Sequence, residues 1–460
     1  MSSATVSVTH SIDRELGATR SGMTATSSRE RISTIDTLRG FGLLGILVMN
    51  IDGFAFPMWR HSLPFATFAQ AHPELNVIAL YLQWILFEGK MRGIFCMLFG
   101  AGVILMTERA ERRGMGEEVA DVYLRRNLWL ALFGALHYVL LWEGDILLNY
   151  ALAALLFLYP LRRISPRWQL ISGGLITVVL TTVCLLPGLK LYNHLHLAHE
   201  ASVLNVQQRA GHVLSDEQKK DLQEWQKLVD SYRSTPENLK KQVTSATGGY
   251  VHDVSERLEN LQSGLSQRFV LMSDNLGAML IGMGLLRIGF LTGELAMSVY
   301  VWIAVIGASI SVPLSVIGVS QVLASRMDFM VADQWLLLPY EVVRVSGMLA
   351  MTAVVVMIIK AGRLRLVQRA LAAIGQTALS NYVLTSLVCQ WVFVYGPWKL
   401  YGKLEFYQLF GVVLGVWTLN VIFSRLWLRY FAFGPLEWLW RSLTHVKWQP
   451  LQLRAVTAAA

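Results

Sequence analysis

A histidine and a carboxylate, separated by a short turn between two apolar stretches, are the residues of this sequence best suited to chemistry. His137 lies near the end of one stretch, and Asp145 starts the next. If the two stretches are antiparallel helices, the imidazole and the carboxylate lie close together. A histidine oriented by a carboxylate is suited to act as a general base, because its unperturbed pKa is about 6.5. The alternative interpretation is a histidine that only packs inside a helix.

A second group of charges stands where the first apolar stretch begins. It consists of Arg31, Asp36 and Arg39. Asp36 and Arg39 are three residues apart and share a helix face, which allows an ion pair and leaves guanidinium donors for an anion. The alternative is that these charges only anchor the helix end at the cytoplasmic surface.

A third group combines charges with glycines. Glu88, Lys90 and Arg92 lie in the glycine-containing run 88–93, between a short apolar piece and a longer one. This pattern predicts a broken helix that lines a polar cavity, with a solvated turn at the membrane surface as the alternative. Glu341 and Arg344 also lie in an apolar segment, three residues apart, and are interpreted as a self-neutralising structural pair.

Three other patterns do not indicate sites. In the histidine-rich tract 194–199 only His196 and His199 align on a helix face, so we predict no metal site. The three cysteines lie in apolar segments without CxxC spacing. The glycine-rich run 280–289 lies inside an apolar segment with no strand before it, which favours close helix packing over a nucleotide-binding loop.

The composition determines which elements hold these residues. The chain has 460 residues, of which 54% are hydrophobic and only 15% are charged. Apolar windows long enough to cross a bilayer as helices recur along it. The net charge of +9 comes from short basic runs beside these windows, which indicates membrane topology rather than nucleic-acid binding. The predicted fold is an all-α polytopic membrane protein.

The number of crossings follows from segment lengths and basic runs. Eleven apolar segments cover residues 37–56, 75–87, 91–106, 127–142, 146–161, 169–186, 271–291, 295–317, 336–359, 371–395 and 406–428. Basic runs at 29–39, 109–126, 162–167, 360–369 and 425–447 are expected to share the cytoplasmic side. Segment 75–87 is then a half-helix or interfacial piece. We predict about ten transmembrane helices, with both termini cytoplasmic.

The long polar stretch 190–268 is predicted to be a helical extracytoplasmic insertion. Ser215 and Gln218 form a candidate capping box, and apolar residues follow at helical spacing. We expect a helical hairpin that caps the bundle. The predicted division is a disordered tail (1–30), an N-terminal bundle (31–189), the insertion (190–268), a C-terminal bundle (269–441) and a second cytoplasmic tail (442–460).

Several motifs together resemble the bacterial YeiB-like family, catalogued as domain of unknown function 418. They are the Arg-x4-Asp-x2-Arg-Gly opening from Arg31, Glu-Gly-Lys-x-Arg at 88–92, Leu-Phe-Gly-Ala-Gly at 98–102, His137 with Gly-Asp-Ile-Leu at 144–147, Gly-Gln-Thr-Ala-Leu-Ser-Asn-Tyr at 375–382 and Gly-Pro-Leu-Glu-Trp-Leu-Trp-Arg at 434–441. The opening is also similar to that of transmembrane acyltransferases, including the acyltransferase-3 group and heparan-alpha-glucosaminide N-acetyltransferase.

That resemblance implies membrane-bound acyl transfer from cytosolic acyl-CoA to an acceptor on the far side. Acyl-CoA would be a co-substrate, with no cofactor bound permanently. The basic residues near Arg31, Arg39, Lys90 and Arg92 would receive its phosphates, with Asp36 and Glu88 beside them. His137, oriented by Asp145, would activate a small-molecule or glycan acceptor. The expected partners are membrane lipids and that acceptor. A solute transporter and a non-catalytic envelope scaffold are the alternatives.

Overall fold

The protein is helical throughout the part of the chain that the structure describes. The computed structural model describes residues 33–56, 71–114, 116, 118–185, 187–232, 243, 244, 246–263 and 265–452. Six helical segments are long and apolar enough to cross a membrane, and they cover 33–55, 73–112, 297–324, 340–360, 378–395 and 406–427. The predicted all-α membrane fold is confirmed, whereas the count of ten crossings stays a prediction.

The helices of the first half run to the start of the insertion. They are α2 (Ser33–Ala55), α4 (Pro73–Leu82), η2 (Gln83–Phe87), α5 (Lys90–Arg112), α6 (Glu118–Leu140), α7 (Leu147–Ala153), η3 (Ala154–Leu158), α8 (Tyr159–Leu161), α9 (Pro166–Gly174) and η4 (Leu175–Leu185).

The insertion and the second half contain the remaining elements. They are α10 (Pro187–Arg209), α11 (Asp216–Tyr232), α13 (Tyr250–Ser263), α14 (Leu265–Arg287), α15 (Met297–Ala324), α16 (Phe329–Ala332), η5 (Asp333–Leu337), α17 (Tyr340–Lys360), α18 (Arg365–Gln376), α19 (Ala378–Gln390), η6 (Trp391–Tyr395), η7 (Phe406–Gln408), α20 (Leu409–Trp427) and α21 (Pro435–His445).

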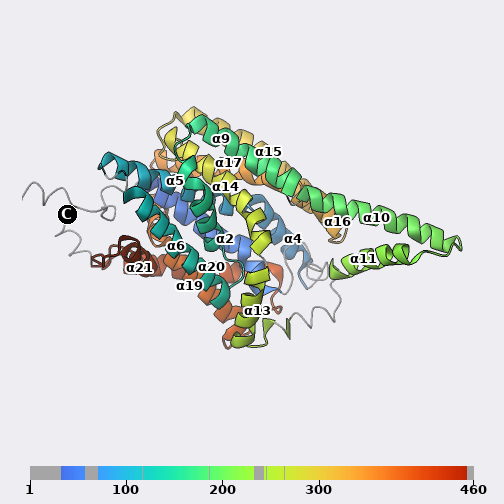
Figure 1. The fold of residues 1–460 in the computed structure, drawn as a ribbon. Coiled ribbons are helices and arrows are strands. Elements are labelled where there is room, and N and C mark those ends of the chain that lie inside the picture. The colour runs from blue at the N-terminus through green and yellow to red at the C-terminus, as the bar shows by residue number, and fades with distance from the viewer. Residues whose placement is uncertain are drawn as a thin grey trace, which may run out of the picture.

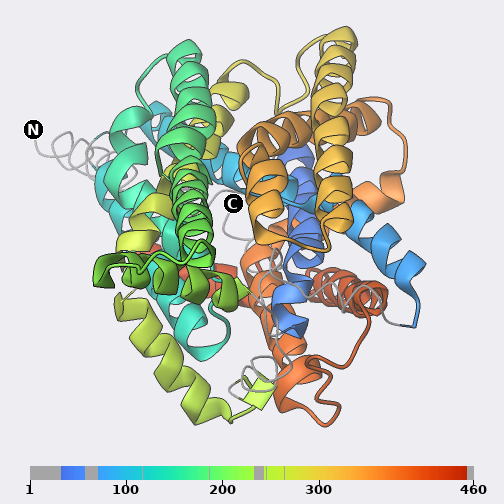
Figure 2. The ribbon, with the colours of Figure 1, turned by 90° about the vertical axis from the view of Figure 1, so that its right-hand side faces the viewer.

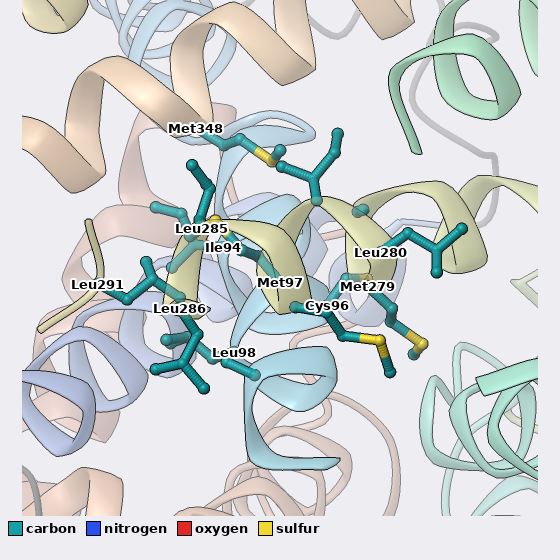
Figure 3. Close-up of a cluster of buried hydrophobic side chains, with 14 of the residues drawn as sticks. Ile94, Cys96, Met97, Leu98, Met279, Leu280, Leu285, Leu286, Leu291 and Met348 are labelled. Atoms are coloured by element: carbon teal, nitrogen blue, oxygen red, sulfur yellow. The ribbon is translucent and has the colours of Figure 1, made fainter. Parts of the chain in front are cut away.

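The bundle is held together by helices that touch backbone to backbone. A Cβ on Gly100 of α5 would lie 2.0 Å from the carbonyl oxygen of Met279, and a Cβ on Gly282 of α14 would lie 1.9 Å from that of Met97. The two methionines belong to the buried cluster around this crossing (Figure 3). The glycine-rich run therefore serves close helix packing, as predicted.

The two ends of the bundle differ. At the end where α2 begins, the connections of several helices meet: Arg287 donates to Glu108 and to the Ile164 carbonyl, and Arg162 pairs with Glu111. We call this the arginine end. From the opposite end, the hairpin end, α10 and α11 project away from the bundle (Figure 1) and point toward the viewer in Figure 2.

The insertion is helical in the part that the structure describes. The capping box is present, because the Ser215 N–H donates to Gln218 Oε1 at 2.9 Å and the Gln218 N–H donates to Ser215 Oγ at 3.3 Å. Helix α11 folds back along α10, and its Tyr232 ring stacks on Phe329 of α16, while α13 lies beside α6 (Figure 1). The helical hairpin that caps the bundle stays a prediction, as does the predicted domain division.

Two helices are broken inside the bundle. The predicted break is present: η2 ends at Phe87, Gly89 has φ 71°, and α5 begins at Lys90. A second break divides the segment predicted as one crossing at 336–359. There η5 ends at Leu337 and α17 begins at Tyr340, because Pro339 lacks an N–H and restricts the residue before it.

The two breaks lie against each other. Tyr340 Oη donates to Glu88 Oε1 at 3.0 Å. A Cβ on Gly89 would lie 2.9 Å from Tyr340 Oη, so only glycine leaves room for the tyrosine. The two broken helices therefore cross at the point where each is interrupted.

Candidate functional site

A cavity of about 210 Å³ lies at the arginine end. It is lined by Arg39 of α2, Arg126 of α6 and Arg441 of α21, and apolar side chains of α5 form its inner wall. We call it the arginine cavity. Its three guanidinium groups come from elements that are far apart in the sequence, so only the folded bundle brings them together.

Packing against the backbone and against aromatic rings positions these guanidinium groups. Arg39 Nη1 donates to Asp36 Oδ1 at 2.8 Å and to the Gly375 carbonyl at 3.3 Å. The guanidinium carbon of Arg126 lies 3.8 Å from the ring centroid of Trp440, whose indole N–H donates to the Arg126 carbonyl at 2.8 Å. Arg126 is thus held as a cation over a ring.

Positive charge dominates this end of the bundle. Burial, together with the positive charges of Arg441, Arg126 and Arg125, lowers the pKa of His445 to about 4. The acidic cavity residue Glu437 is engaged elsewhere: its carboxylate accepts hydrogen bonds from the Leu379 and Ser380 N–H groups at 2.6 and 3.2 Å. The cavity is therefore suited to an anion such as a phosphate.

The structure separates the basic residues that the sequence grouped as one donor site. Arg31 lies outside the described residues. Asp36 and Arg39 form the expected pair at the arginine cavity. Lys90 and Arg92 do not line that cavity, because α5 runs antiparallel to α2.

A contact between α2 and α5 shows where Lys90 and Arg92 lie along the bundle. A Cβ on Gly45 would touch the Met91 side chain, so Lys90 and its neighbours lie opposite the middle of α2. The expected cluster of Arg39, Lys90 and Arg92 is corrected to two separate groups.

The second group is a buried charge network in the middle of the bundle. Arg92 Nη1 lies 2.5 Å from Asp274 Oδ2. Arg344 pairs with Asp274 as well, and its Nε donates to Glu341 Oε2 at 2.7 Å. Two arginines and two carboxylates neutralise one another, which agrees with the structural interpretation of Glu341 and Arg344.

Lys90 and Glu88 complete this inner region. Lys90 is 1% exposed, and its ammonium donates to the carbonyls of Trp84 at 2.8 Å and Glu88 at 3.3 Å. Glu88 accepts the hydrogen bond from Tyr340. Both side chains are thus used at the helix break.

His137 and Asp145 are brought together as the sequence suggested. His137 Nδ1 lies 3.0 Å from Asp145 Oδ1, and both side chains are almost fully buried. The two atoms are close but poorly aligned for a hydrogen bond, which is common at catalytic pairs before a substrate binds. Asp145 Oδ2 accepts the Leu148 N–H at 2.8 Å, which fixes the carboxylate at the start of α7.

The other ring nitrogen of His137 faces a serine. His137 Nε2 lies 2.9 Å from Ser386 Oγ of α19. The ring of Tyr382, one helical turn earlier on α19, packs over the imidazole with centroids 4.8 Å apart. Tyr382 also lines the arginine cavity, so the histidine lies directly behind one wall of that cavity.

A second cavity of about 210 Å³ opens at the hairpin end. Its polar wall includes Glu143 of the loop before α7 and Arg257 of α13. Burial raises the pKa of Glu143, an effect that Arg257 partly offsets. We call this the hairpin-side cavity.

The two cavities approach the histidine from opposite ends. On α2, Arg39 lines the arginine cavity and Phe54 lines the hairpin-side cavity. The two residues are fifteen positions apart, which corresponds to roughly 22 Å along an α-helix. Between the cavities a space of about 10 Å³ is lined by Tyr382, Ser386, Phe54 and Trp142. The rings of Phe54 and Trp142 stack with centroids 3.9 Å apart and separate this space from the hairpin-side cavity.

Comparison with known proteins shows which sequences this chain resembles. Residues 285–447 match the family model described as "Protein of unknown function (DUF418)". The chain is 28% identical to YxaH of Bacillus subtilis (strain 168), over 94% of this chain and 98% of that protein. It is 29% identical to YeiB of Escherichia coli (strain K12), over 90% of this chain and 96% of that protein. Residues 285–447 thus resemble the DUF418 family, and most of the chain resembles YxaH and YeiB. No solved structure matches the chain.

The sequence alone did not indicate several residues around the cavities and the charge network. Arg441 ends the motif at 434–441, but its sequence context does not identify it as a cavity residue. Arg126 was counted only as topology, and Asp274 was hidden in an apolar segment. Ser386 carries no local signal, because a serine in a membrane helix is ordinary; only the packing of α19 against α6 identifies it.

Proposed function

We propose that this protein transfers an acyl group from acyl-CoA, bound at the arginine end, to an acceptor in the hairpin-side cavity. The observation that carries the proposal is the placement of His137 and Asp145 between two cavities that open at opposite ends. A water-soluble donor and an acceptor on the far side would then reach one catalytic group without either crossing the bilayer.

The donor would bind by its phosphates. Arg39, Arg126 and Arg441 present guanidinium groups that form charge-assisted hydrogen bonds with phosphate oxygens. The apolar inner wall of the arginine cavity suits the acyl end, which would point toward Tyr382. We assign this end to the cytoplasm, because most basic connections gather there and acyl-CoA is cytosolic.

His137 would act as the general base. With the proton on Nδ1 facing Asp145, Nε2 can accept a proton from a hydroxyl or amine during attack on the thioester carbonyl. The products are the acylated acceptor and free coenzyme A. The protein would belong to the bacterial inner membrane, with both termini cytoplasmic.

The test uses the whole protein in proteoliposomes with labelled acetyl-CoA and a cell-envelope extract as the source of acceptors. We expect label in the extract and release of free coenzyme A. His137→Ala should lower the rate by at least ~100-fold, because general base catalysis contributes about 10²–10⁴-fold. The matched control is His196→Ala, which alters an exposed histidine of the projecting hairpin. Full transfer by His137→Ala would refute the assignment of the base.

Solute transport is a second candidate, favoured by one observation. The two broken helices have corresponding architecture: in each, a five-residue π-helical turn, Gln83–Phe87 or Asp333–Leu337, precedes the interruption. Paired discontinuous helices are typical of transporter binding sites. Solute uptake into proteoliposomes without coenzyme A release would support transport and contradict acyl transfer.

A further inference from the structure

Ser386, His137 and Asp145 have the order of a nucleophile, a base and an orienting carboxylate. The Ser386 hydroxyl lies 2.9 Å from one imidazole nitrogen, and the carboxylate lies 3.0 Å from the other. The three residues come from α19, α6 and the loop before α7. This is the arrangement that activates a hydroxyl for attack on a carbonyl.

The hydrogen-bond geometry favours an activated serine over a serine bonded to its own helix. A helical serine commonly donates to the carbonyl four residues earlier. Here that contact, to the Tyr382 carbonyl, measures 3.4 Å and is longer than the 2.9 Å to His137 Nε2. Because Asp145 favours a proton on Nδ1, Nε2 is left to accept the proton of Ser386.

Ser386 also lies between the two cavities, where an acyl group would pass from donor to acceptor. Its side chain lines the small space between the two cavities, in contact with neither solvent end. Tyr382 stands on the donor side, and the stacked pair Phe54 and Trp142 stands on the acceptor side. Donor and acceptor would therefore meet this serine from different directions.

We propose that Ser386 is the nucleophile and carries the acyl group as an ester between donor and acceptor. This deepens the proposed acyl transfer and rests on it. In the first step the Ser386 proton passes to His137 Nε2, an Oγ–carbon bond forms, the carbon–sulfur bond breaks, and the proton leaves with the coenzyme A thiolate.

In the second step the acceptor attacks the ester. Its hydroxyl or amine gives a proton to His137, the acyl carbon bonds to the acceptor, and Ser386 Oγ leaves and recovers the proton. No oxidant or reductant is needed. The acyl group thereby changes sides in two short transfers at one buried centre.

The test looks for the ester. The whole protein in nanodiscs is given labelled acetyl-CoA without acceptor, quenched in acid, digested and examined by mass spectrometry. We expect one acetyl group on the peptide that contains Ser386, with an equal amount of free coenzyme A. Ser386→Ala should lose the adduct and at least ~100-fold of the transfer rate. Ser386→Cys, which keeps a nucleophile, should form a thioester that neutral hydroxylamine cleaves.

A matched control is Ser346→Ala, since Ser346 donates to the Val342 carbonyl at 2.6 Å within α17 and lines neither cavity. It should keep both the adduct and the rate. Transfer that survives in Ser386→Ala at the wild-type rate, or an acetyl group on another residue, would overturn the relay and leave the proposed function standing. Absence of any transfer by the wild-type protein would refute both.

Discussion

At the scale of single residues, this protein uses charge in three ways. Arg39, Arg126 and Arg441 line a cavity, whereas Arg92 and Arg344 are neutralised in the middle of the bundle. The third use is a paired histidine and carboxylate. A guanidinium that lines a cavity suits an anionic ligand, and one that is neutralised by buried carboxylates suits packing. The function of a charged residue here depends on what faces it.

Arg126 gives the prediction that belongs to this scale. Arg126→Gln should raise the KM for acetyl-CoA roughly 10-fold or more, since a hydrogen bond to a charged group is worth about 1.5–3 kcal/mol. The kcat should change little, because Arg126 does not touch His137. Steady-state kinetics in proteoliposomes measure both. Arg344→Gln, by contrast, should lower the yield of folded protein, because it leaves Asp274 without its buried partner. An unchanged KM in Arg126→Gln would argue against phosphate binding in the arginine cavity.

At the scale of elements, the sequence predicted what local patterns determine. Glycines beside charges predicted the break at Gly89, and Ser215 with Gln218 predicted a helix start. The break at Pro339 was missed because apolar residues surround it and hide the interruption. The arginine cavity could not be predicted, because Arg126 and Arg441 are brought together by the docking of α21 on α6. Such docking depends on contacts that are distant in sequence.

The crossing of α5 and α14 gives the prediction at the element scale. Gly282→Ala should destabilise the protein by about 1–3 kcal/mol, because the added Cβ meets the Met97 carbonyl and only backbone movement can relieve the clash. Thermal unfolding in detergent measures the change. Gly411→Ala is the matched control, since a Cβ there would meet no atom within 4 Å. Equal melting temperatures for the two variants would contradict a backbone contact at the crossing.

At the scale of the whole molecule, the two cavities make a divided path through the bundle. The arginine cavity ends at Tyr382, and the hairpin-side cavity ends at Phe54 and Trp142. In the proposed reaction, this division would keep donor and acceptor apart until both reach His137. It would also exclude bulk water from the thioester, which would otherwise be hydrolysed.

Removing the aromatic barrier between the two cavities should allow acetyl-CoA to be hydrolysed without transfer to the acceptor. Phe54→Ala removes the ring stacked on Trp142 and should let water reach His137 from the hairpin-side cavity. We expect acetyl-CoA hydrolysis to rise while transfer to the acceptor falls, as measured by thiol release against labelled product. Phe423→Ala serves as the control, because it disrupts a comparable aromatic pair with Trp427 away from both cavities. If Phe54→Ala does not increase hydrolysis, the stacked pair is not the barrier.

The Lys90 ammonium has a consequence for the membrane itself. A broken helix leaves carbonyls without partners, and in hydrocarbon these normally recruit water. Lys90 donates to the carbonyls of Trp84 and Glu88, so the interruption carries its own hydrogen-bond donors. Water molecules are then not needed inside the bundle to donate hydrogen bonds to these carbonyls. The break at Gly89 can thus lie within the bundle without a row of water molecules along which protons could cross the membrane.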